Sequence, residues 1–227
     1  MLVSGHRASL LCRKGREARQ GAMRMAFDEE KERDSKEAAI VAAARKTFLS
    51  QGFEGASMDR IAQEAGVSKR TVYNRFRSKE DLFAAAIEDC CRDILPVDVE
   101  IAESSLSTVA FVTALAHAFL RGLLQADALA LRRIASFEAG RNPALGRLFL
   151  AHGPARIAAS YAPILDRVAR REGLTIPDVE IAIYQLGALI SEPLHTEALF
   201  GAPPDDLEGA IAAQIERALT AFWKIYG

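Results

Sequence analysis

The residues with the clearest chemical potential lie in one short stretch, GVSKRTVYNRFRSKEDL, at residues 66–82. The part of it from Gly66 to Lys79 contains no acid and five cations, namely Lys69, Arg70, Arg75, Arg77 and Lys79. The whole chain of 227 residues is nearly balanced, with 29 basic and 30 acidic residues. Because a solvated helical face usually mixes both signs, we interpret the cluster as a surface for a polyanion.

The polar side chains among these cations match the chemistry of DNA. Arginine and lysine donate to guanine edges or phosphates, asparagine pairs with adenine, a threonine methyl contacts thymine, and a tyrosine hydroxyl reaches phosphate. The expected contacts are Lys69, Arg70, Thr71, Tyr73, Asn74 and Arg75 on one helix, with Lys79 at the start of the next. The alternative is a solvated charged face without a partner.

Two short helices joined by a tight turn would present these side chains. Ser57 and Ser68 are each predicted to cap a helix, and Gly66 between them can take the positive φ that the turn demands. Val72 and Phe76, four residues apart, are predicted to pack inward together. This pattern is typical of a helix-turn-helix, whose second helix enters the roughly 12 Å wide major groove.

The rest of the chain also has a helical period, so we expect an all-α fold. Ile40 and Phe48 lie on the apolar stripe of a first helix that Gly52 is predicted to end, and Ser78 with Asp81 forms a predicted capping box for a fourth. Beyond it, helices are predicted near 104–125, 127–139, 143–152, 154–172, 178–199 and 206–226.

Residues 36–90 resemble the amino-terminal domain of TetR-type transcriptional repressors, through IVAAARKTFLSQGFEGASMDRIAQEAGVSKRTVYNRFRSKEDLF. The stretch SFEAGRNPALGRLFLAHGPARI, residues 136–157, looks like the subgroup with AefR-like carboxy-terminal domains. The resemblance implies an all-helical homodimer with a three-helix DNA-binding head. A fourth helix would link this head to a carboxy-terminal body that binds an effector and dimerises.

The resemblance also implies roles for single residues. Ser57 would cap the helix that meets the DNA backbone, and phosphates would be held by Tyr73 and Lys79. Bases would be read by Lys69, Arg70, Thr71, Asn74 and Arg75. Many members have glycine at the position of Arg70 and histidine or tyrosine at that of Asn74. These two departures concern the operator sequence and leave DNA binding itself as the expectation.

Three segments follow from these patterns. Residues 1–34 are predicted to be a disordered tail, since 1–27 carry six cations against Glu17 alone and an acidic run follows; the alternative is a basic arm that contacts DNA. Residues 35–82 form the predicted helix-turn-helix domain. Residues 83–227 form the predicted ligand-binding and dimerisation domain, which is richer in apolar side chains, with 12 basic against 16 acidic residues over 91–227.

Two sets of apolar residues in the body have a predicted role. An effector cavity is predicted to have the wall residues Phe111, Leu115, Phe119 and Tyr161. A dimer interface is predicted at the apolar stripes of the last two helices, with Leu186, Ile190, Ile215, Leu219 and Phe222. The alternative for the first set is ordinary core, and for the second it is packing of both stripes inside one subunit.

Other classes of protein find little support. Residues 1–227 contain no apolar run of the roughly 18 residues that a spanning helix needs, no export signal, no phosphate loop and no nucleophile motif. Three cysteines and four histidines lack metal-binding spacings, so we expect no cofactor, no membrane partner and a cytoplasmic setting.

The sequence therefore predicts a DNA-binding transcriptional regulator that is not an enzyme. Its partners would be a double-stranded operator, a second copy of the chain, and a small hydrophobic or amphipathic effector that releases it as a repressor. The alternative is a ligand-independent or protein-partnered regulator whose body only dimerises. A body with a solid core would favour that alternative.

Overall fold

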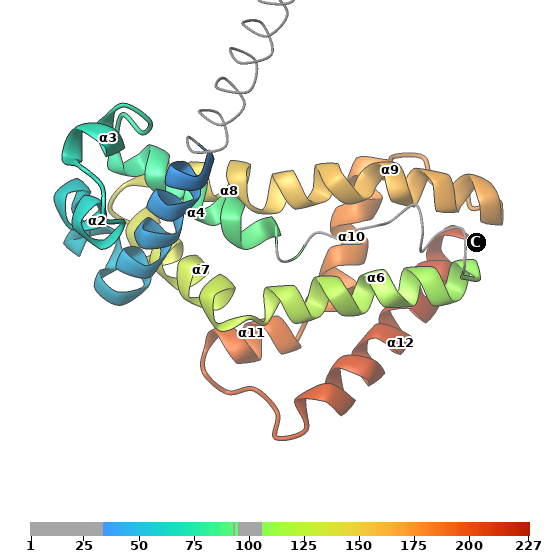
Figure 1. The fold of residues 1–227 in the computed structure, drawn as a ribbon. Coiled ribbons are helices and arrows are strands. Elements are labelled where there is room, and N and C mark those ends of the chain that lie inside the picture. Colours follow the sequence, from blue (N-terminus) through green and yellow to red (C-terminus); the bar gives the residue numbers. More distant parts are fainter. Residues whose placement is uncertain (1–33, 93, 95–105) are drawn as a thin grey trace, which may run out of the picture.

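The computed structural model describes residues 34–92, 94 and 106–227, and all regular elements in these ranges are helices. The predicted tail up to residue 33 lies outside them. A first helix over 34–55 is followed by α2 (Met58–Glu64), α3 (Lys69–Tyr73), α4 (Lys79–Arg92), α6 (Thr108–Leu123), α7 (Ala126–Ala139), α8 (Pro143–His152), α9 (Pro154–Glu172), α10 (Val179–Ser191), α11 (Leu194–Leu199) and α12 (Leu207–Tyr226). Figure 1 shows the first helices gathered at one end, and α6, α9, α10 and α12 in the body beyond α4.

The caps and the turn of the helix-turn-helix are as predicted. The hydroxyl of Ser57 accepts a hydrogen bond from the amide of Arg60 at 3.2 Å, and that of Ser68 accepts from Thr71 at 3.1 Å. Gly66 has φ 65°, the left-handed conformation that glycine adopts without a steric penalty. Val72 is fully buried, which fixes the inward face of α3 and leaves the opposite face to solvent.

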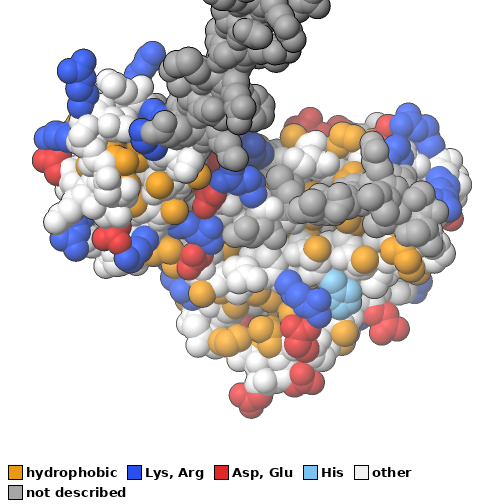
Figure 2. Space-filling model, in the orientation of Figure 1, with side chains coloured by type: hydrophobic (Ala, Val, Ile, Leu, Met, Phe, Trp, Pro, Cys, Tyr) orange, Lys and Arg blue, Asp and Glu red, His pale blue; other side chains and the backbone are white. Residues whose placement is uncertain are grey.

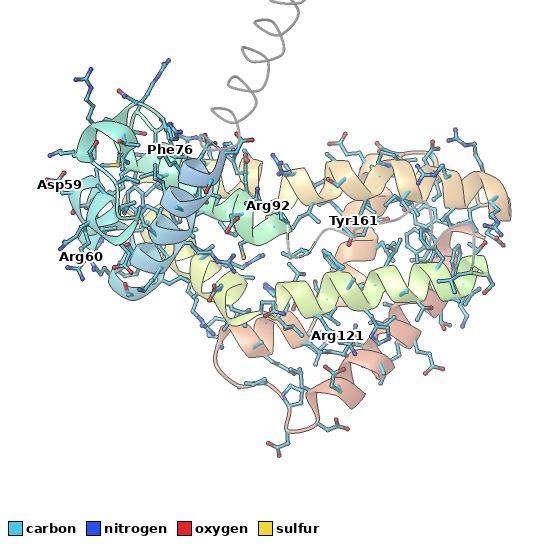
Figure 3. The ribbon with its side chains drawn as sticks, viewed as in Figure 1. Asp59, Arg60, Phe76, Arg92, Arg121 and Tyr161 are labelled. Carbon is cyan, nitrogen blue, oxygen red and sulfur yellow. The ribbon has the colours of Figure 1, made fainter. Side chains whose placement is uncertain are left out.

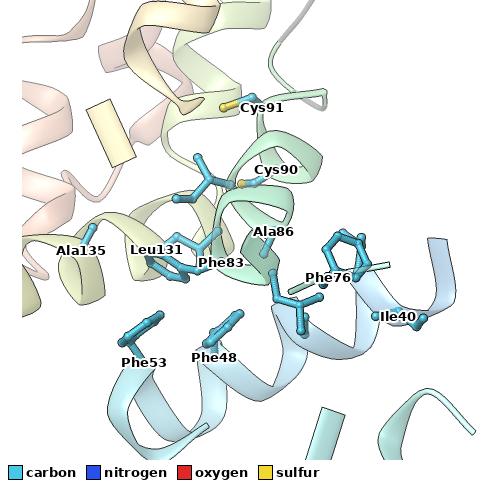
Figure 4. Packing of buried hydrophobic residues seen from close by; sticks show 14 of the residues in the cluster. Ile40, Phe48, Phe53, Phe76, Phe83, Ala86, Cys90, Cys91, Leu131 and Ala135 are labelled. Atoms are coloured by element: carbon cyan, nitrogen blue, oxygen red, sulfur yellow. The ribbon is translucent and has the colours of Figure 1, made fainter. Parts of the chain in front are cut away.

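The first helix extends to residue 55, and the prediction that Gly52 ends it is wrong. Gly52 has φ 73° but lies within the helix, and the extra turn buries Phe53. The ring of Phe53 lies 5.8 Å from that of Phe48 and 5.2 Å from that of Phe83 on α4. Such close aromatic packing makes a solid core under the head. Figure 4 shows this core continuing along α4 to Cys90 and across to Leu131 of α7.

A charged network also joins the head to the body. Arg45, on the first helix, donates to Asp89 of α4 at 3.2 Å and to Asp127 at the start of α7 at 2.9 Å. At the start of α4 half of the predicted capping box is present, because the amide of Asp81 donates to the Ser78 hydroxyl at 3.1 Å. The Asp81 carboxylate accepts instead from the amide of Arg77, one residue before the cap, also at 3.1 Å. The helix that links the two regions is thus fixed at its first turn.

The body contains the predicted helices with one change. The helix predicted over 178–199 is two, α10 and α11, separated at Pro193, because proline lacks the amide that would continue the ladder. Gln214 of α12 lies at this break, and its side-chain amide donates to the carbonyls of Leu189 and Glu192, both at 2.6 Å. A buried side chain therefore replaces the lost helical hydrogen bonds.

The five residues predicted at the dimer interface instead pack inside the subunit. Between 1 % and 8 % of each side chain is exposed for Leu186, Ile190, Ile215, Leu219 and Phe222. Their stripes face each other, since α10 packs on α12 and both contact α6. While this packing holds, these side chains cannot contact a second subunit. The arrangement matches the alternative, in which both stripes pack inside one subunit.

No single helix in the described ranges is both long and apolar enough to cross a membrane. The pair α6 and α7, bent by 59°, reaches the necessary length and composition only when the two are taken together.

Candidate DNA-binding face and body cavity

The outer face of α3 presents side chains that are free to meet a ligand. Arg70 and Asn74 are exposed, and among the described residues neither side chain has a hydrogen-bond or ion-pair partner. Tyr73 between them is 45 % exposed although it is a large aromatic residue. Figure 2 shows lysine and arginine side chains over this end of the molecule with some acidic ones among them, and further acidic side chains near the loop between α11 and α12.

Two other predicted contacts already have partners within the head. The ammonium of Lys69 lies 2.7 Å from the carboxylate of Asp59 on α2, and this hydrogen bond raises the pKa of Lys69. The same ammonium lies 5.9 Å from the centre of the Tyr73 ring. The hydroxyl of Thr71 lies 2.8 Å from that of Ser68. The pair of Lys69 and Asp59 joins α3 to α2, and Figure 3 shows Asp59 at the outer edge of α2.

The remaining predicted contacts lie at the edges of the face. Arg75 is half-buried, at the end of α3. Lys79 donates to the backbone carbonyl of Glu54 at 3.4 Å, and its ammonium lies 4.5 Å from the centre of the Phe53 ring. Ser57 uses its oxygen as an acceptor for the α2 cap and keeps its hydroxyl proton available. Lys79 and Ser57 therefore combine a structural role with positions from which a phosphate can be reached.

The body contains a cavity of about 250 Å³. Three of the four predicted wall residues line it, namely Leu115 and Phe119 of α6 and Tyr161 of α9. Phe111 does not, and its side chain, only 2 % exposed, is part of the packed core. Each four-residue step turns by about 40° around the helix. Phe111 lies two steps from Phe119, about 80° around α6, and so falls outside the face that lines the cavity.

The linking helix α4 forms part of the cavity wall. Ile87, Cys90 and Cys91 line it from α4, together with Ile94 just beyond. Tyr161 points from α9 toward α6 in Figure 3, and its ring lies 5.9 Å from that of Phe119. Its hydroxyl donates to the carbonyl of Ile94 at 3.1 Å, so one wall residue holds the end of the linking helix directly.

Burial disfavours the charged forms of Cys91 and Tyr161 in this part of the wall. It raises the pKa of the Cys91 thiol to about 12 and raises that of the Tyr161 hydroxyl as well. Outside the cavity, Glu88 of α4 lies 2.6 Å from His152 of α8 and 3.3 Å from Arg156 of α9. The ion pairs of Glu88 on α4 and the hydrogen bond to Ile94, just beyond its end, therefore both tie this part of the chain to the body.

The sequence analysis missed one part of the cavity, its polar end. Arg132 of α7, Ser191 of α10 and His195 of α11 line it there. His195 is 4 % exposed, and burial, followed by the charge of Arg132, lowers its pKa. No sequence signal could have joined them, because 59 residues separate Arg132 from Ser191 and only the tertiary fold brings α7 beside α11.

Comparison with known proteins assigns both regions. Residues 40–86 match the family described as bacterial regulatory proteins, tetR family, and residues 111–227 match the AefR-like transcriptional repressor, C-terminal domain. The chain is 39 % identical over 56 residues to the transcriptional activator FasR of Mycolicibacterium smegmatis and 38 % identical over 68 residues to the regulator RutR of Escherichia coli. These matches span 25 % and 30 % of this chain and only 26 % and 32 % of those relatives.

Solved structures are similar over most of the chain. The flavonoid-responsive regulator FrrA is 33 % identical, with a TM-score of 0.67 over 85 % of this chain and 97 % of that one. A TetR-family regulator from Mesorhizobium loti is 28 % identical, with a TM-score of 0.70 over 86 % and 98 %. These relatives are transcriptional regulators and not enzymes. Since the carboxy-terminal match alone covers more than half of its residues, the chain belongs to the TetR family of transcriptional regulators.

Proposed function

We propose that the protein is a homodimeric repressor that a small hydrophobic or amphipathic effector releases from its operator. The observation that carries this proposal is the cavity, because α4 forms part of its wall and also begins beside the recognition helix α3. A regulator whose body only dimerises has no use for such a space. The proposed domains are the head at 35–82 and the body at 83–227, and the proposed setting is the cytoplasm, where the DNA is.

The proposed mechanism couples the cavity to the head through α4. A ligand can weaken DNA binding only by as much as it prefers the non-binding state, and a hundredfold release requires about 2.7 kcal/mol of differential affinity. A ligand against Ile87 and Cys91 touches α4 directly, and one against Tyr161 acts on the hydrogen bond to Ile94. Either contact can shift the helix and thereby change the spacing of two recognition helices in a dimer.

The release can be tested with a duplex selected from a random library by the purified protein. Binding of the labelled duplex is followed by fluorescence anisotropy while a probe is added. A flavonoid such as naringenin is a rational first probe, since FrrA is described as flavonoid-responsive. We expect the apparent affinity for the duplex to fall at least tenfold. An unchanged affinity with a probe shown to occupy the cavity would contradict the proposed switch.

A variant that fills the cavity should bind DNA but ignore the probe. A Cβ at Gly187 would have its nearest neighbour, the Phe119 ring, at 3.8 Å, so Gly187→Leu extends into the open space. The matched control is Ser160→Leu, which adds the same side chain on the exposed face of α9. We expect release to be lost in the first variant and kept in the second. Equal release in both would place the effector elsewhere.

Tyr161→Phe tests the coupling. It keeps the ring against Phe119 and removes only the hydrogen bond to Ile94, which is worth about 1 kcal/mol. We expect the probe to bind nearly as well, with a smaller difference in operator affinity between the free and the bound states. If binding and release both stay as in the native protein, the hydrogen bond is not part of the coupling.

The proposed DNA contacts are Ser57, Lys69, Arg70, Thr71, Tyr73, Asn74, Arg75 and Lys79. Arg70 is the strongest candidate for reading a base, because it is exposed and has no partner among the described residues. Arg70→Ala should cost roughly 1 to 3 kcal/mol on the selected duplex and relax base preference, whereas Lys79→Ala should weaken all duplexes about equally. A uniform loss for Arg70→Ala would assign Arg70 to phosphate.

The proposed dimer interface uses the outer faces of α10 and α12. Exposed apolar side chains lie there, with Ile181 55 % and Ile225 59 % exposed. Ile181→Asp should therefore give a folded monomer in sedimentation experiments. Leu186→Asp, five residues further along α10 but buried, should instead unfold the body. An intact dimer of Ile181→Asp would exclude this face of α10.

A further inference from the structure

The polar side chains of the cavity gather at one end of an otherwise apolar wall. Arg132, Ser191 and His195 come from α7, α10 and α11, and the charge of Arg132 is close enough to lower the pKa of His195. The phenol of Tyr161, in contrast, already donates to the Ile94 carbonyl. The cavity thus has a polar end with hydrogen-bonding capacity and an apolar remainder that reaches α4.

Arg132 lines the cavity as a half-buried cation, and no carboxylate of the described residues forms an ion pair with it. Within the described part of the chain its guanidinium has neither a hydrogen bond nor an ion pair. The adjacent Arg133 shows what a structural arginine looks like here, because it donates to the carbonyls of Leu199 at 2.7 Å and Ala198 at 2.8 Å. A partly desolvated charge is costly unless it is paired, so the missing partner of Arg132 points to a ligand.

The two neighbours of Arg132 complete a small binding site. Ser191 is 9 % exposed, and its hydroxyl has no hydrogen-bond partner in the described ranges. His195, 4 % exposed, has Nδ1 3.7 Å from the Glu192 carboxylate, so one ring nitrogen remains for another partner. A guanidinium and a hydroxyl match the acceptors of a single carboxylate, because arginine binds this group with two parallel hydrogen bonds.

Resting on the proposed function, we infer that the effector is an amphipathic monoanion. Its carboxylate or equivalent anionic group pairs with Arg132 and accepts a hydrogen bond from Ser191. Its apolar part extends past Phe119 toward the α4 residues of the wall. One cation matches one negative charge. A cationic ligand would be repelled by Arg132, and a neutral one would leave it unpaired.

The only tryptophan of the chain, Trp223, lines the cavity and reports occupancy without DNA. The probes are decanoate, decan-1-ol and decylammonium, which share one alkyl chain and differ in charge, each titrated below its micelle concentration at pH 7.5. We expect decanoate to quench or shift the Trp223 emission with at least tenfold higher affinity than decan-1-ol, and decylammonium to bind most weakly. Equal affinity for the three probes, or no binding of decanoate, would overturn the inference.

Substitution of the two adjacent arginines locates the charge effect. Arg132→Gln should lower decanoate affinity by roughly tenfold to a hundredfold and leave decan-1-ol unchanged, as expected for loss of a charged hydrogen bond. Arg132→Lys should restore part of the loss. Arg133→Gln is the control and should alter neither probe. A loss of both probes in a folded Arg132→Gln variant would show a packing role instead.

Operator release separates this inference from the proposed function. If decanoate binds with the expected preference but leaves the affinity for the duplex unchanged, the inference of an anionic ligand is supported and the proposed release from the operator is wrong. If decan-1-ol or decylammonium binds best and releases the duplex, the switch stands and the anionic class is wrong.

Discussion

The head and the body bury their aromatic side chains in different ways. In the head, Phe48 and Phe53 stack with ring centres 5.8 Å apart in a fully packed cluster. In the body, Phe119 and Tyr161 also touch, but their rings border a cavity of about 250 Å³. A head that presents side chains to DNA gains from a rigid core, whereas a body that senses a ligand needs space whose filling can alter its packing.

The largest expected difference between the regions is in their response to salt. If a dimer neutralises roughly eight phosphates, log affinity for DNA should fall with log salt at a slope of about minus seven, or around four decades from 50 to 200 mM. Probe binding in the cavity should change far less, since it involves a single, half-buried charge, Arg132, and partly buried charges are screened less than exposed ones. Fluorescence anisotropy of the duplex measures DNA binding, and Trp223 emission measures probe binding. A DNA slope near minus two would contradict an electrostatic head.

The second prediction compares two phenylalanines. Phe48→Ala empties a fully buried site in the head and should cost about 3 to 5 kcal/mol of unfolding free energy. Phe119→Ala should cost clearly less, because one side of this ring already faces unfilled space and makes fewer contacts there. Urea denaturation followed by circular dichroism gives both values. Equal costs would show that the cavity wall is packed as tightly as the head.

The sequence predicted the head in detail because its signals are local. Ser57 and Ser68 cap the helices that follow them, and the spacing of Val72 and Phe76 depends only on helix geometry. Even there, a glycine marked a helix end incorrectly, since burial of Phe53 favours one more turn after Gly52. In the body the helix ranges were close, and Pro193 was a visible signal for the break that the prediction missed.

The tertiary arrangement of the body could not be predicted in the same way. An apolar stripe such as that of Ile215 and Leu219 indicates a buried face, but not whether the partner is the same subunit or another. The polar end of the cavity depends on α7 and α11, which are far apart in the sequence. Arg132 and Arg133 look equivalent in the sequence. Only their surroundings show that Arg133 donates to a backbone carbonyl, whereas Arg132 lines the cavity.

The third prediction sharpens the contrast with two helical glycines. A Cβ at Gly122 of α6 would lie 2.8 Å from Cγ1 and 3.0 Å from Cα of Ile94, so Gly122→Ala should destabilise the protein by about 1 to 3 kcal/mol. At Gly187 the nearest atom would be 3.8 Å away, and Gly187→Ala should stabilise the helix by about 0.5 to 1 kcal/mol. In thermal denaturation, the melting temperature should fall for Gly122→Ala and rise for Gly187→Ala. Destabilisation by both would mean that the cavity closes around Gly187 in solution.

The smallest expected effect concerns pH and also separates the two regions. Residues 34–92 contain no histidine, whereas the body buries His195, whose pKa is lowered by burial and by Arg132 and raised in part by Glu192. Because the unfolded chain then binds more protons than the folded protein, stability should fall as the pH drops through about 6.5 toward the folded-state pKa. The glutamates with lowered pKa, Glu64 and Glu208, titrate below this window.

For a histidine with an ordinary pKa in the unfolded state, the loss between pH 7 and pH 6 is at most about 0.7 kcal/mol. His195→Gln removes this contribution while the other titrating groups stay in place, so the difference between the two proteins isolates His195. Urea denaturation at both pH values should show a smaller loss for His195→Gln than for the native protein. Equal losses would mean that His195 has the same pKa in the folded and the unfolded protein, which would contradict the lowered pKa of the buried ring.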